Sequence, residues 1–353
     1  MKSLMFVTDI HLHPFNNFSK PDDDFINTRF RKQFETLDKV YDLARKSNST
    51  IINGGDLFHV RNQIRIDIFN HIYKYFNKND EVPIIHCVGN HDMKTNNLGS
   101  HHSLYPFKFI NNTQVVDEPK MIEYDEVVDI YFLPFAKETD YLKEWLNKQE
   151  LNKDKINILV GHLEVQGSLS DTGTSKLDGD FLYGDLRPND FDIIYLGHYH
   201  KKQVLGENPN HIYGGSLMQN NFGEGNNENG IYQLTYTSKE DMKFEFIPIE
   251  STKFVTLEGN INKEEVIKLS KDNYVRLRFN EEEIKDLDLE DIDLSNVQVE
   301  VDKSYARETR IDITEKSTEE DVVIAYIDEY LEGDKEIAKY ALECLREAKS
   351  TND

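Results

Sequence analysis

Five apolar runs, each followed at once by residues that bind metals or transfer protons, constrain this sequence more than any other feature. An apolar, β-branched run that stops at a glycine or a polar residue is typical of a buried strand that ends in a sharp turn. In an open α/β sheet, sites form beyond the carboxyl ends of the strands. We therefore expect the five turns to meet at one rim. The candidate side chains are Asp9, His11, Asp56, His59, Asn90, His91, His162, His198 and His200.

The turn after the third run, Val88-Gly89-Asn90-His91-Asp92, supplies a carboxamide, an imidazole and a carboxylate. These groups are suited to metal binding and to proton transfer. Alone, the turn could equally be one that satisfies its own backbone, and a single histidine is more often a hydrogen-bonded loop residue. Only the whole set indicates a site. Within the turn, Asp92 could orient His91 by a hydrogen bond or simply cap the turn.

The first 250 residues predict one α/β domain in which two sheets are flanked by helices. Near the N-terminus, strands alternate with an amphipathic stripe over 30–44 and a helix over about 63–77, which favours parallel strands buried between helices. The expected strands cover residues 3–7, 50–53, 83–87, 127–133, 156–160, 192–196, 229–236 and 242–249. We interpret the last two as consistent with a second sheet packed on the first.

Two smaller parts are expected after this domain, which covers residues 1–250. Residues 251–315 predict a small α+β unit, because short strand-like runs alternate there with acidic helical stretches. Residues 316–353 predict two helices, over 318–331 and 335–349, with a break at Gly333.

The composition excludes some classes of protein. A net charge of −24 argues against a protein that coats nucleic acid, although a nuclease could receive phosphate through metals and a few local cations. Basic residues lie just past the candidate loops, at Arg61, Arg65, Lys201 and Lys202. No apolar run approaches the roughly 20 residues that span a bilayer, and two distant cysteines give no disulfide framework. We expect a cytoplasmic protein that does not bind membranes.

The candidate donors are oxygen and imidazole nitrogen, without a thiolate. That set suits divalent ions such as manganese, iron or zinc. There are too many donors for one tetrahedral ion, whereas a pair of ions roughly 3.5–4 Å apart, sharing one carboxylate, accounts for the number and supports in-line attack at phosphorus.

The motifs Asp-x-His, Gly-Asp, Gly-Asn-His-Asp, Gly-His and Gly-His-x-His, in this order over about residues 4–200, resemble those of the calcineurin-like metallophosphoesterases. The resemblance implies a two-sheet β-sandwich flanked by helices and two divalent metals, most often manganese. It implies one metal on Asp9, His11 and His200 and a second on Asn90, His162 and His198, with Asp56 bridging both. It also implies that His91 is the proton donor and that His59 assists at the site.

Within that superfamily, the stretches 55–59 and 213–224 resemble the SbcD-type nucleases of double-strand-break repair, which include bacteriophage members. This resemblance implies a DNA exonuclease, with endonuclease activity as a further expectation. Residues 251–315 would be a capping domain, and Arg61, Arg65, Lys201 and Lys202 would contact DNA. The C-terminal helices would bind an SbcC-type coiled-coil ATPase, in a heterotetramer built on a homodimer, in the host cytoplasm if phage-encoded. Those helices could instead pack on their own domain.

Two other functions stay open at this point. One is a metallophosphoesterase that acts on small molecules or cyclic nucleotides, although such enzymes rarely carry about 100 extra residues. The other is a scaffold without catalysis that regulates the ATPase, and the full set of candidate ligands argues against it.

Overall fold

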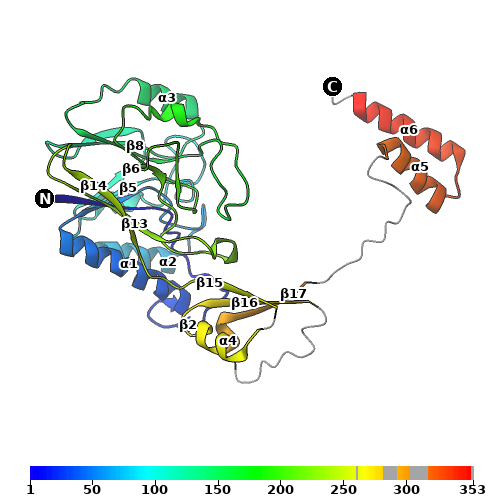
Figure 1. Ribbon diagram of the computed structural model, residues 1–353, viewed down its shortest axis with the longest axis horizontal. Coiled ribbons are helices and arrows are strands. Elements are labelled where there is room, and N and C mark those ends of the chain that lie inside the picture. Colours follow the sequence, from blue (N-terminus) through cyan, green and yellow to red (C-terminus); the bar gives the residue numbers. More distant parts are fainter. Residues whose placement is uncertain (260, 281–291, 303–316, 351–353) are drawn as a thin grey trace. The chain divides into compact units, whose positions relative to one another are not determined.

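The apolar runs of the sequence become central strands of two six-stranded sheets in the computed structural model (Figure 1). The structure describes residues 1–259, 261–280, 292–302 and 317–350. The first sheet has the order β14-β13-β1-β4-β5-β6. Its strands are β1 (Lys2–Val7), β4 (Thr50–Asn53), β5 (Ile84–Cys87), β6 (Thr113–Val116), β13 (Gly230–Tyr236) and β14 (Met242–Pro248). The predicted parallel arrangement is confirmed for β1, β4 and β5, and β6, a strand that the sequence did not predict, continues it.

The second sheet has the order β11-β12-β10-β9-β8-β7, and its strands β8, β9, β10 and β12 are parallel. The bounds are β7 (Lys120–Glu123), β8 (Val128–Leu133), β9 (Ile156–His162), β10 (Ile193–Gly197), β11 (Gln203–Val204) and β12 (His211–Tyr213). The interpretation of 229–236 and 242–249 as a second sheet was wrong. These residues form β13 and β14, and β13 pairs with β1, because the free edge of β1 takes an antiparallel partner from far along the chain.

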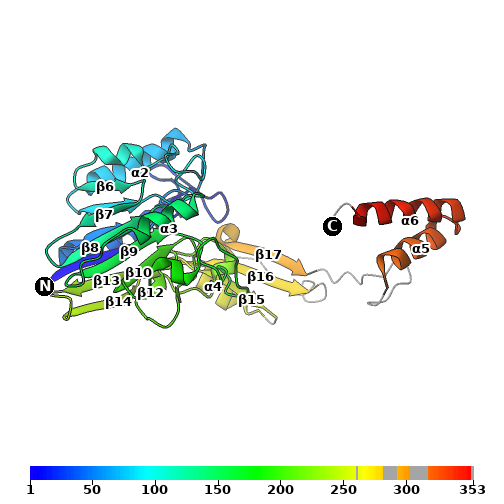
Figure 2. The ribbon, with the colours of Figure 1, turned by 90° about the horizontal axis from the view of Figure 1, so that it is seen from above.

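Alternate side chains of each strand face different layers. On β1, Leu4 and Phe6 join the core between the sheets, whereas Met5 and Val7 join the core beneath helices α1 (Thr28–Ser47) and α2 (Ile66–Lys78). Helix α3 (Thr139–Asn147) covers the outer face of the second sheet. Figure 1 shows α1 and α2 on one side of the paired sheets and α3 on the other, and Figure 2 views the molecule from above.

Local signals explain where the long helix begins and ends. Asn27 caps α1, because its Oδ1 accepts a hydrogen bond from the backbone N–H of Phe30 at 2.8 Å. At the other end, Asn48 adopts a left-handed conformation with φ of 50°, which satisfies the last carbonyls. The next helix, α2, begins at Ile66, three residues later than predicted.

A three-stranded sheet follows the two large ones. It contains β15 (Phe254–Glu258), β16 (Tyr274–Asn280) and β17 (Val297–Asp302), and helix α4 (Lys263–Ser270) packs on it. Residues 260, 281–291 and 303–315 of the predicted capping domain lie outside the described residues. The chain divides into two compact units, Met1–Val301 and Asp302–Asp353. The division into 1–250, 251–315 and 316–353 therefore stays a prediction.

The second unit contains helices α5 (Glu319–Tyr330) and α6 (Lys335–Ser350). Thr318 caps α5 in a reciprocal arrangement with Asp321, and Gly333 has a φ of 67° at the break between the helices. In the part of the chain that is described, no helix is long and apolar enough to span a bilayer.

Candidate metal centre

The five polar turns do meet at one rim, beyond the carboxyl ends of β1, β4 and β5 in one sheet and β9 and β10 in the other. The turns after β1 and β4 are joined by backbone hydrogen bonds, from Asp9 N–H to Gly55 O at 3.1 Å and from His11 N–H to Asp56 O at 3.0 Å. The predicted convergence of strand ends is therefore confirmed as a feature of the fold.

Four of the predicted ligands have left-handed backbone conformations. The φ angles are 51° for Asp9, 50° for His11, 55° for Asp56 and 103° for His198. Such conformations cost a residue other than glycine roughly 1–3 kcal/mol. They persist only where the surrounding structure imposes them, and they cluster at functional sites. The backbone at this rim is strained in order to aim these side chains inward.

Two glycines allow the donors to approach the neighbouring backbone. Gly55 has a φ of 119°, and a Cβ added there would lie 2.2 Å from Nδ1 of His162. A Cβ at Gly89 would lie 2.2 Å from Oδ1 of Asp56. These distances exclude any side chain, so the glycines before Asp56 and Asn90 are required by the packing of the site.

One group of donors consists of Asp9, His11 and His200, and one nitrogen or oxygen of each lies within 4.8 Å of the others. The Nε2 atoms of His11 and His200 are 3.0 Å apart, and Nε2 of His11 lies 3.9 Å from Oδ1 of Asp9. We call these residues the first donor group.

The second donor group consists of Asn90, His162 and His198. Oδ1 of Asn90 lies 2.9 Å from Nε2 of His162 and 3.2 Å from Nδ1 of His198. Asp56 stands between the two groups, because its Oδ2 is 3.2 Å from Nε2 of His162 and 3.7 Å from Nε2 of His11. The structure therefore brings together all seven residues that the sequence predicts as metal ligands.

Fixed hydrogen bonds set the tautomers of three of these imidazoles. Carbonyl and carboxylate oxygens only accept, so the ring nitrogen facing each one must carry the proton. Nδ1–H of His162 donates to Gly54 O at 3.0 Å, and Nδ1–H of His200 donates to Glu224 at 3.0 Å. Nε2 of His198 lies 3.0 Å from a carboxylate oxygen of Glu164. In each ring the other nitrogen points at the donor groups, as metal ligation requires.

The electrostatics of the rim fit bound cations. Asp9 and Asp56 are almost fully buried, and a buried carboxylate is costly unless positive charge lies beside it. Burial raises the pKa of Asp9. Burial opposes the charged form of His162, but the Asp56 carboxylate outweighs it and raises the pKa of His162 to about 9. Burial also opposes the charged form of His200, but Glu224 and Asp9 outweigh it and raise the pKa of His200 to about 10. The rim therefore attracts positive charge, which divalent metals would supply.

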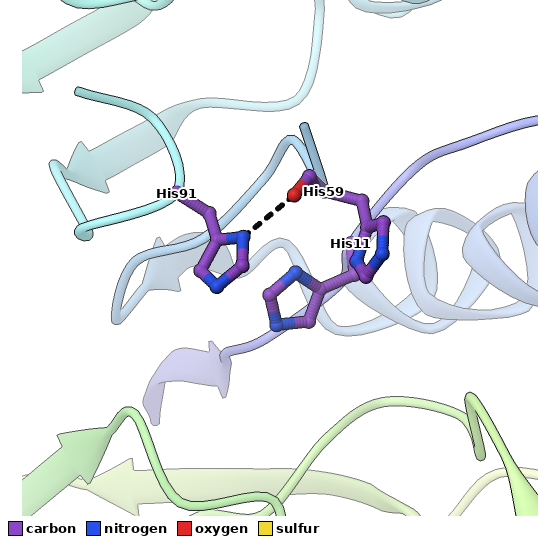
Figure 3. Close-up of side chains that lie close together, drawn as sticks. All are labelled: His11, His59 and His91. Atoms are coloured by element: carbon purple, nitrogen blue, oxygen red, sulfur yellow. Dashed lines mark hydrogen bonds between the residues drawn. The ribbon is translucent and has the colours of Figure 1, made fainter. Parts of the chain in front are cut away.

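His91 lies beside the donors rather than among them. Its Nδ1–H donates to the backbone carbonyl of His59 at 2.6 Å, and its backbone N–H donates to Oδ1 of Asp56 at 2.8 Å. Figure 3 shows the rings of His11, His59 and His91 close together. One ring nitrogen of each of these three residues lies within 4.8 Å of a ring nitrogen of each of the other two. Because Nδ1 is committed to a carbonyl, Nε2 is the atom from which His91 can give a proton.

The side chain of His59 stacks on that of His91, with ring centroids 5.7 Å apart and planes 22° apart. Burial lowers the pKa of His59 to about 4, so the ring is neutral at physiological pH. His13, which the motif pattern does not include, also lies beside it with ring centroids 5.4 Å apart. His59 thus supports His91 through both its carbonyl and its ring.

Asp92 does not orient His91. Its carboxylate accepts backbone N–H groups from Phe58 at 3.0 Å, Gly89 at 3.1 Å and Leu57 at 3.4 Å. The second of the two roles that the sequence left open is therefore correct, because the buried carboxylate ties the loop after β4 to the turn after β5.

Three acidic residues near the donors were missed by reasoning from the sequence. Glu164 and Glu224 hold ring nitrogens of His198 and His200, as described above, and Oδ1 of Asp171 accepts the backbone N–H of His200 at 2.7 Å. Glu164 lies two residues after a predicted ligand, and Glu224 ends one of the family-like stretches, so both carried a weak signal. Asp171 lies in the long loop 165–190 and carried none.

Most of the four predicted DNA-binding cations have polar partners within the chain. The pairs are Arg61 with Asn96, Arg65 with Asp67, and Lys202 with Glu228. Arg61 and Arg65 lie on the loop after β4, and Lys201 and Lys202 on the loop after β10. The cations thus come from both sheets, and their contact with DNA stays a prediction.

Comparison with known proteins gives the class to which this site belongs. The family model of the calcineurin-like phosphoesterases matches residues 2–202, which is more than half of the chain. This chain belongs to the calcineurin-like phosphoesterase family. It is therefore a metallophosphoesterase, a hydrolase that uses divalent metals, with the two-sheet fold that the sequence predicted.

Several individual proteins are similar to the chain. The D subunit of the SbcCD nuclease of Staphylococcus epidermidis is 23% identical over 78% of this chain and 78% of its own length. The same subunit of Staphylococcus saprophyticus is 27% identical over 69% of this chain and 71% of its own length. A protein of Invertebrate iridescent virus 3 named as a phosphoesterase is 27% identical over 72% of this chain and 70% of its own length. A solved structure, a dimetal phosphatase from Danio rerio, has 11% identity and a TM-score of 0.46, covering 71% of this chain and 99% of its own.

Proposed function

We propose that this protein is a metal-dependent DNA nuclease of the SbcD type, an exonuclease with endonuclease activity, that works in DNA repair and recombination. The observation that carries the proposal is the extent of the likeness to the D subunit of Staphylococcus epidermidis. That likeness covers 78% of the chain, whereas the phosphoesterase domain at residues 2–202 accounts for 201 of 353 residues. The likeness therefore continues into the part of the chain beyond the phosphoesterase domain.

The proposed metal centre holds two divalent ions, and we propose manganese, a metal that suits the carboxylate and amide oxygens among the donors. Asp9, His11 and His200 would hold one ion, and Asn90, His162 and His198 the other, with Asp56 shared. Such a pair would activate water for attack at phosphorus and offset charge on the phosphoryl oxygens.

The proton for the leaving oxygen comes from His91 in this proposal. The carbonyl of His59 holds the His91 ring by Nδ1–H and leaves Nε2 to donate. The backbone N–H of His91 is held by Asp56, so the proton donor and the shared ligand are positioned together. A positioned general acid contributes about 10²–10⁴-fold to the rate. We propose that Arg61, Arg65, Lys201 and Lys202 contact the DNA backbone.

We also propose an SbcC-type coiled-coil ATPase as partner, within a heterotetramer built on a homodimer in the cytoplasm. Supporting evidence comes from apolar side chains exposed on α5 and α6, including Ile324, Tyr326 and Tyr340. Exposed apolar faces on paired helices suit docking on another helix. Deletion of 316–353 should abolish binding of the ATPase, and unchanged binding would contradict this part of the proposal.

The test of the nuclease is release of nucleotides from end-labelled linear duplex DNA with Mn²⁺. Wild type should release nucleotides, and His91→Ser should be slower by about 10²–10⁴-fold while binding the same amount of Mn²⁺. His101→Ser, at an exposed histidine, is the matched control and should behave as wild type. The proposal fails if no protein cuts DNA while wild type hydrolyses a small phosphodiester.

That last outcome would favour the second candidate, a metallophosphoesterase for small substrates. The net charge of −24 favours it, because an acidic surface repels DNA but is compatible with a small ligand drawn to the metals. The two candidates share the metal centre and differ only in the substrate.

A further inference from the structure

The segment 219–227 connects the first donor group to the three-stranded sheet. It contains the short 3-10 helix η3 (Phe222–Glu224), and it lies between His200 and strand β15. Apart from the contact between Glu224 and His200, the phosphoesterase chemistry described above assigns no role to this segment. Its contacts on both sides are specific, and they involve a buried carboxylate at one end and an aromatic ring at the other.

At the metal end, Glu224 is only 1% exposed although it carries a carboxylate. Its Oε1 lies 3.0 Å from Nδ1 of His200 and accepts from Nδ2 of Asn221 at 2.9 Å. Its Oε2 accepts the backbone N–H of Asn220 at 2.9 Å. Both carboxylate oxygens are thus committed. Glu224 fixes the proton of His200 on Nδ1 and turns its Nε2 toward the other donors.

At the opposite end, Phe222 packs into the three-stranded sheet. Its ring lies 4.9 Å from that of Phe254 on β15, and the guanidinium of Arg276 on β16 lies 4.7 Å from its centroid. Gln219, at the start of the segment, accepts the backbone N–H of Phe254 at 2.7 Å. The segment is therefore attached to β15 by both a hydrogen bond and a ring contact.

A buried arginine strengthens the same connection from α1. Nη2 of Arg29 donates to the backbone carbonyl of Asn220 at 2.8 Å. Its guanidinium also lies 5.1 Å from the ring centroid of Phe254 and 5.2 Å from that of Tyr274. The peptide units on either side of Asn220 are therefore held by Glu224 and by Arg29, so the segment has little freedom to move independently of the three-stranded sheet.

We propose that Glu224 is a positioning residue for His200, and that the segment 219–227 makes metal binding at the first donor group depend on the packing of β15 and β16. Displacement of Phe222 moves Glu224, which releases Nδ1 of His200 and lets the ring turn away from the site. The inference rests on His200 being a metal ligand, as proposed above, but not on DNA being the substrate.

Calorimetric titration of the metal-free full-length protein with Mn²⁺ tests the proposal without any substrate. Wild type should bind two ions. Glu224→Ala should weaken one site by about 10–100-fold, the usual loss when a partner of a ligating histidine is removed. Glu224→Gln should lose less, because an amide oxygen can still accept Nδ1–H. His200→Ala should lose the same site altogether.

A second test uses Phe222→Ala, a substitution at the end of the segment away from the metal donors that leaves every donor intact. It should weaken the same site several-fold, and added Mn²⁺ should restore hydrolysis. Phe25→Ala is the matched control, because Phe25 is also half-buried but packs on Phe34 and His71 instead. Wild-type affinity in Glu224→Ala and Phe222→Ala, with loss of a site in His200→Ala, would overturn the inference and leave the metal centre standing. Two normal sites in His200→Ala would overturn the metal assignment, and the inference with it.

Discussion

At the amino ends of β8 and β10, the carboxylates of Asp129 and Asp192 each have a lysine beside them, whereas at the carboxyl ends the buried carboxylates of Asp9 and Asp56 face imidazoles. Asp129 near the start of β8 lies 2.8 Å from Nζ of Lys155, and Asp192 just before β10 lies 2.8 Å from Nζ of Lys239. At the rim, the only basic side chains within salt-bridge distance of Asp56 among the described residues are the imidazoles of His11 and His162.

Lysine and imidazole differ in whether they can release a proton and then bind a metal. A lysine ammonium stays charged and cannot bind a metal while it carries its proton, so the amino ends are closed ion pairs. An imidazole can release its proton and offer a lone pair to a metal instead. The amino ends of β8 and β10 therefore carry stability, whereas the rim carries an exchangeable positive charge. The left-handed backbone at the rim adds to this contrast, because the strained conformations there orient the metal donors.

The largest effect that would sharpen the comparison is expected from Asp56→Asn. Removing the charge between the two donor groups should reduce hydrolysis of a phosphodiester by about 10³-fold or more, since metal chemistry contributes several kcal/mol to the transition state. Adding EDTA to wild type should have the same result. The measurement is the initial rate with Mn²⁺ for the variant, wild type and the exposed-site control Asp23→Asn.

If Asp56→Asn retained wild-type rates while EDTA abolished them, Asp56 would not be a shared ligand. The rim would then resemble the amino ends, with carboxylates that serve only the fold.

The sequence could predict the rim because each strand and its donors are adjacent along the chain. An apolar run followed by Gly55-Asp56 or by Gly89-Asn90 predicts both a strand end and a donor beyond it. Parallel order then places the ends together, and no distant contact needs to be known. For this reason the pattern of residues alone indicates these nine side chains, whereas their division into seven ligands and the two assisting histidines His59 and His91 depends on the resemblance to the family.

The remaining features depend on contacts between distant parts of the chain. Glu224 lies 24 residues after His200, and nothing in its local sequence says which ring it holds. Asp171 is one of several acids in the loop 165–190. The pairing of β13 with β1 joins residues that are 226 to 234 positions apart, and alternation alone cannot choose a partner strand.

A second way to test the comparison is Asp129→Ala at the amino ends. Removing one partner of a buried pair costs about 3 kcal/mol of unfolding free energy, the lower part of the usual range because Lys155 keeps some contact with water. Hydrolysis by the folded protein should not change. Urea unfolding and the initial rate are measured together.

The control is Glu144→Ala, which removes an exposed pair with Lys148 and should leave the free energy of unfolding nearly unchanged. An equal loss of unfolding free energy in both variants would show that the amino-end ion pairs stabilise the fold no more than an exposed pair does. A loss of activity in Asp129→Ala would mean that the two ends are coupled.

The smallest effect is expected from His86, an imidazole on β5 that has no carboxylate beside it among the described residues. Its ring packs on Phe76 and Phe107, and its Nδ1 lies 3.0 Å from the amide nitrogen of Asn53. Burial lowers the pKa of His86 to about 3, in contrast to the raised pKa values of His162 and His200, which have carboxylates beside them. As the pH falls below about 6.5, the unfolded chain takes up this proton first, so stability is lost with acid and is complete above that pH.

Between pH 7 and pH 5 this group should therefore remove about 2 kcal/mol of unfolding free energy from wild type. His86→Gln should be less stable at pH 7, but its stability should fall by about 2 kcal/mol less over the same interval in urea unfolding of the metal-free protein. His101→Gln should keep the wild-type slope. If His86→Gln had that slope too, His86 would be protonated in the folded state, and the contrast between imidazoles with and without carboxylates would not account for the charge distribution of the rim.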